Sequence, residues 1–443
     1  MSINPRFVEY FHETFFSEKP EEFQEFLASL EVWIPRTIRI KPWKEQEVKK
    51  RLEQYGFLLG ETYIPNVFTL GRSDDFDPLE RRIGFTMDHL VGNFYIQELA
   101  AATSVHILTD GKIHTEQFVI LDMAASPGGK TTQLSEQYPD SFIIANEPTR
   151  ERIPQLLQNL DRMGSANIGV TLYPGQYFRN TPEVFDRILL DAPCSGEGTL
   201  YKGTDATKHW HIKNIKTIAR LQEKLLDAAI IALKVWWEMV YSTCSMNLLE
   251  NEWVLEAIDS KYPNTFEILS SKHFWPHIDH TGGFFVAKIR KIAPILLKEK
   301  LERSVNVNEE IRTYKGHFHA GALDHAITLY EHTGKILALK THPSLETLRK
   351  KYYFMRFWEK IATVNEGDIV LDAFSHRYFD TSSIQKYEIR DEEELDIYLR
   401  WWELATTLSD GKVMMVYQSI IISWEVVQDG KISNTFPHDW RRK

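Results

Sequence analysis

The chain has 443 residues, of which 43% are hydrophobic, 12% aromatic and 26% charged. This composition excludes disordered, collagen-like and coiled-coil proteins, and the length predicts roughly two to four domains. Two cysteines exclude a disulfide framework, and a net charge of −10 argues against a non-specific polyanion binder, because phosphate contacts need Lys and Arg.

The amino-terminal segment mixes helical and extended patterns. Residues 7–30 are amphipathic, and the alternation over residues 33–40 predicts a strand. The sequence opens without a basic stretch followed by an apolar one, and no run of about 18 apolar residues occurs later, so we expect a soluble, cytoplasmic, monomeric protein with no membrane partner. The segment is locally basic, as a nucleic-acid partner would require; its cations are Arg36, Arg39, Lys41, Lys44, Lys49, Lys50 and Arg51.

From residue 117 to residue 290, short apolar runs alternate with helix-length stretches. This alternation predicts an α/β domain with a parallel, doubly wound sheet. The runs are residues 118–121, 142–145, 188–190 and 239–241, and the stretches are residues 150–163, 215–233 and 249–260.

The region after residue 293 predicts one or two smaller α+β modules. A charged helical stretch at residues 296–303 precedes alternating strands at 413–417 and 419–427. Residues 349–358 interleave cations and aromatic residues, which is typical either of a single-stranded RNA contact or of an amphipathic helix that packs its aromatic residues inward. His317, His319 and His325 have no cysteine or clear carboxylate partner, so we expect no metal site.

A glycine-rich turn follows the first apolar run and precedes a helix, where open α/β sheets bind ligands. It fits neither a Walker A loop, because Ala124 stands at the first glycine position, nor the dinucleotide fingerprint. Glu147 follows the next apolar run, where an acidic residue can bind ribose hydroxyls. Its spacing from the turn suits S-adenosylmethionine as well as a dinucleotide. The alternative to a ligand site is a tight turn followed by a surface carboxylate. The turn consists of Ala124, Ala125, Ser126, Pro127, Gly128, Gly129 and Lys130.

Both cysteines come just after apolar strands. Cys194 follows residues 188–190, with Asp191 at the strand end, and Cys244 follows residues 239–241. Because parallel strands share one direction, both thiols should emerge at the edge that carries the glycine-rich turn. A free cysteine is usually a small buried hydrophobic residue, and a lone Asp often caps a helix. Two thiols in polar turns beside an acid favour covalent catalysis instead.

Methylation at carbon 5 of a pyrimidine needs such a set of groups. That carbon is too weakly nucleophilic until a thiolate adds to carbon 6, which is covalent catalysis. An acid at ring nitrogen 3 would neutralise the charge that develops, and a base must later remove the carbon 5 proton.

Three motifs in order resemble the Nol/Nop/Sun family of RNA (cytosine-5) methyltransferases: residues 124–130, residues 191–199 followed by 208–210, and residues 241–252. The tail is similar to the C-terminal modules of the family's bacterial 16S ribosomal RNA members. The resemblance implies four parts: an RNA-binding domain at residues 1–75, a Rossmann-like S-adenosylmethionine-dependent core at 76–293, an accessory module at 294–365 and a PUA-like RNA-binding module at 366–443.

The resemblance also implies roles for the site residues. Cys244 would be the nucleophile and Cys194 would assist release of the methylated product. Asp191 would contact the cytosine ring, with Lys130 beside it. The cofactor would be held by Ala124, Ala125, Ser126, Pro127, Gly128, Gly129, Lys130 and Glu147, with Arg152 supporting Glu147 and Asp191 bordering the cofactor.

Several positions depart from the family pattern, and two stretches among them lie between the motifs. Residues 172–176 lack the Asp that binds the adenine amino group, so one cofactor contact is lost unless Gln176 replaces it. Trp236 and Trp237 stand where the family often has Pro-Gly-Gly, which predicts a different loop or a protein contact.

The sequence therefore predicts an S-adenosylmethionine-dependent methyltransferase that forms 5-methylcytosine in RNA, with small-subunit ribosomal RNA as the expected substrate. A transfer RNA methyltransferase is the alternative within this class. A catalytically weak RNA-binding ribosome-assembly factor and a P-loop phosphotransferase are the alternatives outside it.

Overall fold

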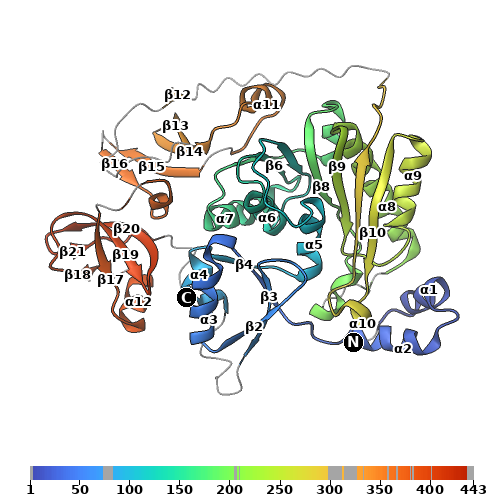
Figure 1. The fold of residues 1–443 in the computed structure, drawn as a ribbon, viewed down its shortest axis with the longest axis horizontal. Coiled ribbons are helices and arrows are strands. Elements are labelled where there is room, and N and C mark those ends of the chain that lie inside the picture. The colour runs from blue at the N-terminus through green and yellow to red at the C-terminus, as the bar shows by residue number, and fades with distance from the viewer. Residues whose placement is uncertain are drawn as a thin grey trace.

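The computed structural model describes residues 3–72, 83–203, 207, 208, 210–297, 312, 313, 327–332, 334–356, 359–365, 368–379, 381, 384–400 and 402–436. Four sheets follow one another along the chain, the largest of them central (Figure 1). His317, His319 and His325, and most of the helix predicted at residues 296–303, lie outside the described residues.

The chain begins with two short helices, α1 (Pro5–Phe15) and α2 (Pro20–Ser29). Each has a proline in its first turn, where a backbone N–H has no helical partner to lose. Phe7, Phe11 and Phe26 are fully buried and form one cluster with Trp210 and Trp275 of the central domain. The amphipathic stretch predicted at residues 7–30 is therefore a helical hairpin packed on the central domain.

A four-stranded sheet in the order β2-β3-β1-β4 follows the hairpin. Apolar side chains on one of its faces, among them Ile38 and Phe68, pack on Val48 and Leu52 of α3. The other face meets the central domain, where Arg39 donates to the Gly129 carbonyl oxygen. The elements are β1 (Thr37–Ile40), η1 (Pro42–Lys44), α3 (Glu45–Gln54), β2 (Phe57–Glu61), β3 (Val67–Arg72), η2 (Ile83–Phe85), α4 (Met87–Leu90) and β4 (Phe94–Ile96).

The central sheet has seven strands in the order β10-β11-β9-β8-β5-β6-β7. Strands β5 to β9 pair in parallel, as the alternation predicts, whereas β11 runs antiparallel to both β9 and β10. The strands are β5 (Val119–Asp122), β6 (Phe142–Asn146), β7 (Ile168–Thr171), β8 (Phe185–Asp191), β9 (Leu233–Thr243), β10 (Phe266–Phe274) and β11 (Phe284–Lys291).

Helices cover both faces of the central sheet. Residues of α5, α6 and α7 pack on one face, and residues of α8, α9 and α11 (Leu345–Lys351) pack on the other. Of the described helices, none combines the length and the apolar composition that crossing a bilayer demands. The helices are α5 (Leu99–Leu108), α6 (Gly129–Gln137), η3 (Arg150–Arg152), α7 (Ile153–Met163), η4 (Gly175–Asn180), η5 (Glu197–Lys202), α8 (Ile212–Ala232), α9 (Glu252–Lys261) and α10 (Pro276–Asp279).

Two five-stranded sheets complete the chain, in the orders β12-β13-β14-β15-β16 and β17-β19-β20-β21-β18. The first includes β12 (Arg312–Thr313), β13 (Ile327–His332), β14 (Lys335–Lys340), α11 (Leu345–Lys351), β15 (Glu359–Asn365), β16 (Asp368–Leu371) and η6 (Ser375–Tyr378). The second includes β17 (Gln385–Glu388), α12 (Glu392–Leu399), β18 (Leu404–Ala405), β19 (Gly411–Tyr417), β20 (Ile420–Gln428) and β21 (Lys431–Ile432). The strands predicted at residues 413–417 and 419–427 are confirmed as β19 and β20.

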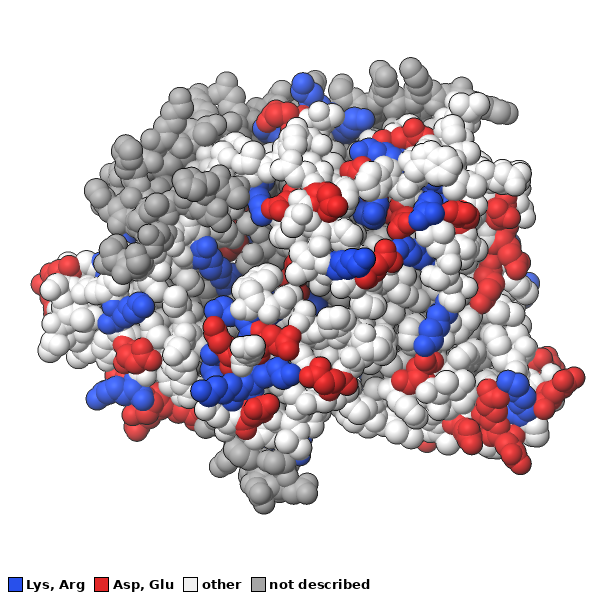
Figure 2. All heavy atoms as spheres, in the orientation of Figure 1, with Lys and Arg blue, Asp and Glu red and all other residues white. Residues whose placement is uncertain are grey.

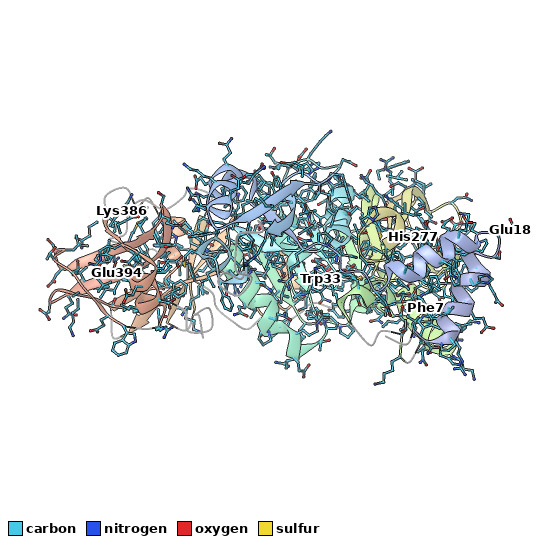
Figure 3. All side chains as sticks on the ribbon, turned by 90° about the horizontal axis from the view of Figure 1, so that it is seen from below. Phe7, Glu18, Trp33, His277, Lys386 and Glu394 are labelled. Atoms are coloured by element: carbon cyan, nitrogen blue, oxygen red, sulfur yellow. The ribbon has the colours of Figure 1, made fainter. Side chains whose placement is uncertain are left out.

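The surface carries charges of both signs. Figure 2 shows acidic side chains gathered over α1 and α2, and Lys and Arg side chains interleaved with acidic ones over the region of α3 and the sheet that follows them. Seen from below (Figure 3), the molecule is elongated: the C-terminal modules with Glu394 lie at one end, the hairpin with Phe7 at the other, and Trp33 lies between them.

Candidate active site

The carboxyl ends of β5, β8 and β9 form one edge of the central sheet. Strands β8 and β9 are neighbours, and Asp191 at the end of β8 lies opposite Ser242 of β9. Beyond the strands, the Gly198 N–H donates to the Cys244 carbonyl oxygen at 3.0 Å. The two loops that carry Cys194 and Cys244 are therefore joined, as their positions after adjacent parallel strands predict.

The two thiols meet between these loops. Both cysteines are half-buried, and the Cys194 thiol hydrogen-bonds to Cys244. This hydrogen bond, together with burial, raises the pKa of Cys194 well above its ordinary value. Cys194 therefore keeps its proton and donates a hydrogen bond to the sulfur of Cys244.

An ion pair lies beside the thiols. The Lys130 Nζ donates to Asp191 Oδ2 at 2.7 Å, and the Ser242 hydroxyl donates to Asp191 Oδ1 at 2.8 Å. Burial alone would lower the pKa of Lys130, but the charges of Asp191 and Cys244 outweigh burial and raise it. The positive charge of Lys130 therefore lies near Cys244. The Asp191 carboxylate lies beside Lys130, and each of its two oxygens accepts a hydrogen bond.

Two buried carboxylates, which the sequence analysis did not single out, lie behind the cysteines. Glu197 accepts hydrogen bonds from the backbone N–H groups of Met246 and Asn247, at 3.0 and 2.9 Å. Glu250 accepts from the backbone N–H of Ser195 at 2.9 Å. Each carboxylate thus reaches from one cysteine loop to the other. Both stand inside the quoted motifs, and that position is the only signal that the sequence offers for them.

The two carboxylates share donors with one another. The Ser245 hydroxyl lies 3.1 Å from an oxygen of each, and the Asn247 side-chain amide lies 3.0 Å from Glu197 and 2.8 Å from Glu250. Both carboxylates are fully buried, and burial together with the charge of Glu250 raises the pKa of Glu197. This network fixes the backbone on each side of both thiols.

The glycine-rich turn forms a cradle between β5 and α6. Gly128 has φ +106°, a conformation that a side chain would strain, and its amide precedes the first turn of α6. The turn is held to the next loop by Arg152, whose guanidinium donates to the Ser126 carbonyl oxygen at 2.8 Å. The backbone of the turn can therefore approach a ligand closely, with the helix N-terminus facing it.

Glu147 completes the cradle at the end of β6. Its side chain is 1% exposed, and its Oε1 accepts from the Thr149 N–H at 2.9 Å. Its Oε2 lies 3.3 Å from Arg152 but accepts no hydrogen bond from the described residues. A buried carboxylate oxygen that lacks a donor suits a ribose diol, so the donor set fits S-adenosylmethionine.

The two stretches that depart from the family pattern between the motifs have different locations. Gln176 is half-buried at the start of η4, directly after β7 and on the cofactor edge. Trp236 and Trp237 lie within β9 instead of in a loop. Trp236 has φ +70° and is 70% exposed, while the ring of Trp237 packs on Phe118 and under the Arg187 guanidinium. The tryptophan pair therefore lies at the start of β9, far along the strand from Cys244.

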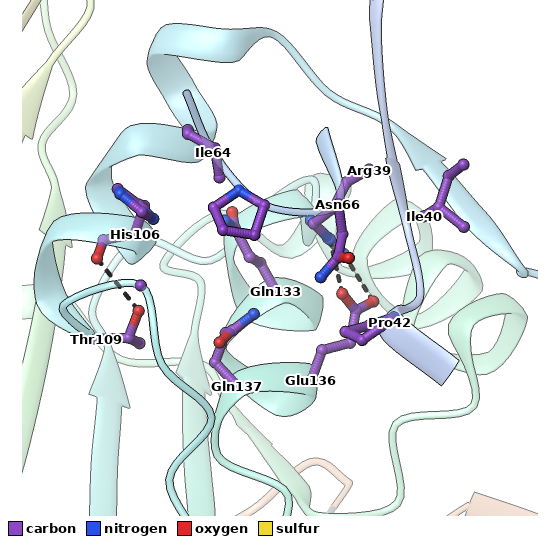
Figure 4. A pocket seen from close by; sticks show the side chains of 12 residues that line it. Arg39, Ile40, Pro42, Ile64, Asn66, His106, Thr109, Gln133, Glu136 and Gln137 are labelled. Atoms are coloured by element: carbon purple, nitrogen blue, oxygen red, sulfur yellow. Dashed lines mark hydrogen bonds and ion pairs between the residues drawn. The ribbon is translucent and has the colours of Figure 1, made fainter. Parts of the chain in front are cut away.

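Most cations of the predicted basic segment serve the fold. Arg39 pairs with Glu136 at 2.8 Å on the wall of a small pocket (Figure 4), and Arg51 pairs with Asp88 at 2.7 Å. Lys41 donates to the Met163 carbonyl oxygen. Lys44 and Lys49 pair with glutamates. Of the seven cations, Arg36 and Lys50 stay exposed, so the basic surface is smaller than the sequence predicts.

Two of the aromatic residues at positions 349–358 serve packing, and Phe357 and Trp358 lie outside the described residues. Tyr352 is fully buried and Phe354 is 8% exposed, both in the core beside α8 and β6. Arg356 pairs with Asp161 of α7. The inward packing of the second interpretation holds for these two residues, but its helix does not: α11 ends at Lys351, before both of them, and Tyr353 is 49% exposed.

Comparison with known proteins agrees with the motifs. Residues 112–290 match the sequence model of the family described as 16S rRNA methyltransferase RsmB/F. The chain is 35% identical over 314 residues to the ribosomal RNA small subunit methyltransferase F of Erwinia tasmaniensis, covering 66% of this chain and 64% of that protein. It is 38% identical over 234 residues to the protein of that name from Shewanella piezotolerans, covering 49% of each. The matched part covers less than two thirds of the length of these relatives. The family resemblance predicted from the motifs is confirmed.

Solved structures confirm the fold. A methyltransferase homolog protein from Pyrococcus horikoshii superposes with a TM-score of 0.56 and 28% identity, over 66% of this chain and 96% of that one. The structure of NSun6 from the same organism, with SFG, has a TM-score of 0.56 at 22% identity, over 65% of this chain and 98% of that one. The central domain therefore has the Rossmann-like methyltransferase fold that the sequence predicts.

Proposed function

We propose, from the premise that residues 112–290 belong to the RsmB/F family of methyltransferases, that this chain methylates carbon 5 of a cytosine in small-subunit ribosomal RNA, using S-adenosylmethionine. One observation carries the proposal: two hydrogen-bonded thiols lie beside a lysine–aspartate ion pair at the ligand-binding edge of the sheet. Covalent activation of a pyrimidine needs a thiolate and a partner that offsets charge on the ring, and this edge holds both.

Cys244 is the nucleophile in this proposal. Its sulfur accepts a hydrogen bond from Cys194 and lies near the charge of Lys130, at the edge of the sheet where the ring would bind. The sulfur forms a bond to carbon 6, and the electron pair of the carbon 5–carbon 6 double bond moves into the ring. Asp191 holds the ring edge and Lys130 offsets the negative charge that develops there.

The acidity of the Cys194 thiol changes when the adduct forms. Its pKa is raised first by the hydrogen bond to Cys244 and also by the charge of Cys244. Once the sulfur of Cys244 is bonded to carbon 6, it no longer carries that charge, so the pKa of Cys194 falls. Cys194 can then release its own proton to solvent, and the thiolate that results accepts the carbon 5 proton. Removal of that proton restores the double bond and expels the Cys244 thiolate.

The cofactor would be held by the turn of residues 124–130 and by Glu147. When bound, S-adenosylmethionine supplies an electrophilic methyl group. The helix N-terminus after Gly128 faces the bound molecule, and the buried Oε2 of Glu147 is available to accept a hydrogen bond from a ribose hydroxyl. The modules at residues 1–75, 294–365 and 366–443 are proposed to bind and present the RNA.

The test incubates the purified protein with tritium-labelled S-adenosylmethionine and with RNA that lacks the modification. Small-subunit ribosomal RNA, intact small subunits and transfer RNA are tested separately, and 5-methylcytosine is mapped by bisulfite sequencing. We expect one methylated cytosine in the small-subunit RNA. Methylation confined to transfer RNA would change the substrate, and RNA binding without any transfer would leave the assembly-factor alternative. Binding of a nucleoside triphosphate at the glycine-rich turn would favour the phosphotransferase.

A further inference from the structure

A groove opens at one end of the amino-terminal sheet, apart from the catalytic edge. It has a volume of about 430 Å³, in the range of sites that bind small ligands. Phe57, Leu70 and Ile83 supply apolar wall, and Trp33, Arg36 and Arg72 supply an indole and two guanidinium groups. The groove therefore combines a flat aromatic surface with positive charge.

The indole of Trp33 is unusually exposed for its size. It is 63% exposed, and the Arg36 guanidinium lies 5.8 Å from its ring centroid. Arg72 lies over the Phe57 ring at 4.9 Å on the other side of the groove. Arg36 is one of the two cations of the basic segment that remain exposed, so its charge faces solvent at the groove.

A series of backbone and side-chain contacts leads from the groove to the loop of Cys244. The Leu70 N–H donates to the Arg36 carbonyl oxygen at 2.8 Å, and the next residue, Thr37, donates through its hydroxyl to the Gln97 carbonyl oxygen. The adjoining Glu98 accepts from the N–H of Gly282 at 3.2 Å. The N–H of the next residue, Gly283, donates to the Gly198 carbonyl oxygen, and the Gly198 N–H donates to the Cys244 carbonyl oxygen, both at 3.0 Å.

We infer that Trp33, Arg36 and Arg72 form a subsite that stacks one unpaired base of the RNA near the target cytosine. This inference rests on the proposed function for the identity of the ligand. Proteins recognise single-stranded RNA by stacking bases on aromatic rings and guanidinium planes, while cations attract the phosphates. The groove offers both groups, whereas the acidic hairpin α1–α2 repels phosphate, so a strand that enters the active site is guided past Trp33.

The test compares two strands that carry the same number of phosphates. A fluorescein-labelled 12-nucleotide oligouridylate and a 12-unit strand of stable abasic nucleotides are titrated with the full chain, and binding is followed by fluorescence anisotropy. We expect the wild type to prefer the strand with bases. Trp33→Ala should weaken binding of the oligouridylate by about 5- to 100-fold and change binding of the abasic strand by less than about twofold. Arg36→Ala should weaken binding of both strands, because it removes charge.

Two variants serve as controls. Trp33→Phe keeps an aromatic ring and should keep most of the preference for bases. Trp43→Ala removes an equally exposed indole, 62% exposed with Lys41 at 5.9 Å, beyond the opposite end of β1, and should bind both strands as the wild type does.

Methyl transfer to small-subunit ribosomal RNA, measured on the same preparations, separates this inference from the proposed function. If the wild type methylates RNA but Trp33→Ala binds both strands like the wild type, the subsite is wrong and the proposed function stands. If no RNA is methylated yet the preference for bases depends on Trp33, the subsite stands and the proposed function fails. A wild type that shows no preference for bases overturns the subsite.

Discussion

Glu250 gives the sharpest prediction about how the active site is held. Its carboxylate accepts four hydrogen bonds, from the Ser195 backbone and from the side chains of Gln222, Ser245 and Asn247, at distances of 2.8 to 3.1 Å. Ser245 and Asn247 keep Glu197 as an acceptor in Glu250→Ala, whereas the Ser195 N–H and one hydrogen of the Gln222 amide lose theirs. A buried donor that loses its acceptor costs about 1 kcal/mol at the least, so these two predict a loss of about 2 kcal/mol in the free energy of unfolding.

Urea denaturation followed by tryptophan fluorescence measures this loss. The matched control is Glu256→Ala, on the exposed side of α9, which should change the free energy of unfolding by less than about 0.5 kcal/mol. A loss below about 1 kcal/mol in Glu250→Ala would refute the reasoning. In the isosteric Glu250→Gln, whose amide presents hydrogens to some of the same donors, we expect slower methyl transfer with an unchanged Kd for S-adenosylmethionine, because Glu250 holds the thiol loops and not the cofactor.

Three further predictions concern the charged groups around the thiols. Burial raises the pKa of Asp122 to about 7, so the native state keeps a proton that the unfolded chain releases near pH 4, and stability falls as the pH rises between these values. Asp122→Asn removes the titrating group, so between pH 4 and pH 7 the free energy of unfolding of this variant should rise by up to about 4 kcal/mol relative to that of the wild type. Urea denaturation at several pH values measures this difference, and a difference that does not change with pH would contradict the prediction. Lys130→Met should slow single-turnover methyl transfer at saturating cofactor by about 100-fold, because Asp191 and the ring lose their positive partner, and a slowing of less than about tenfold would argue against that role. Glu147→Gln should raise the Kd for S-adenosylmethionine by about 10- to 100-fold in calorimetry, whereas a Kd within about twofold of the wild type would leave the buried oxygen without a role.

The sequence predicts the central fold well because its signals are local. The apolar runs and the glycine-rich turn each lie within a few residues, and parallel strands bring their carboxyl ends together. Direction is not local: the antiparallel course of β11 depends on its pairing with β9. Trp237 shows the same limit of prediction from sequence. It lies in β9 and not in a loop, and its ring packs on Phe118, which is more than a hundred residues earlier in the chain.

The surface and the buried carboxylates were harder to predict for a related reason. Arg39 lies in a basic segment, but its partner Glu136 is 97 residues away, so the sequence alone does not show that its charge is neutralised. Glu197 and Glu250 are fully buried, which is rare for a carboxylate unless donors surround it. Glu197 takes donors from Met246 and Asn247, and Glu250 takes them from Ser195 and from Gln222 of α8; these lie 28 to 55 residues away in sequence, so only the fold brings them together.

The roles of the two cysteines are the central claim, and trapping of the covalent protein–RNA complex tests them most directly. Wild type, Cys244→Ala and Cys194→Ala are incubated with S-adenosylmethionine and unmodified small-subunit ribosomal RNA, and complexes that survive denaturing electrophoresis are counted along with 5-methylcytosine. We predict turnover without an accumulated complex for the wild type, neither product nor complex for Cys244→Ala, and an accumulated complex for Cys194→Ala, because its adduct forms but does not resolve. A complex that forms in Cys244→Ala, or 5-methylcytosine made by that variant, would contradict the account.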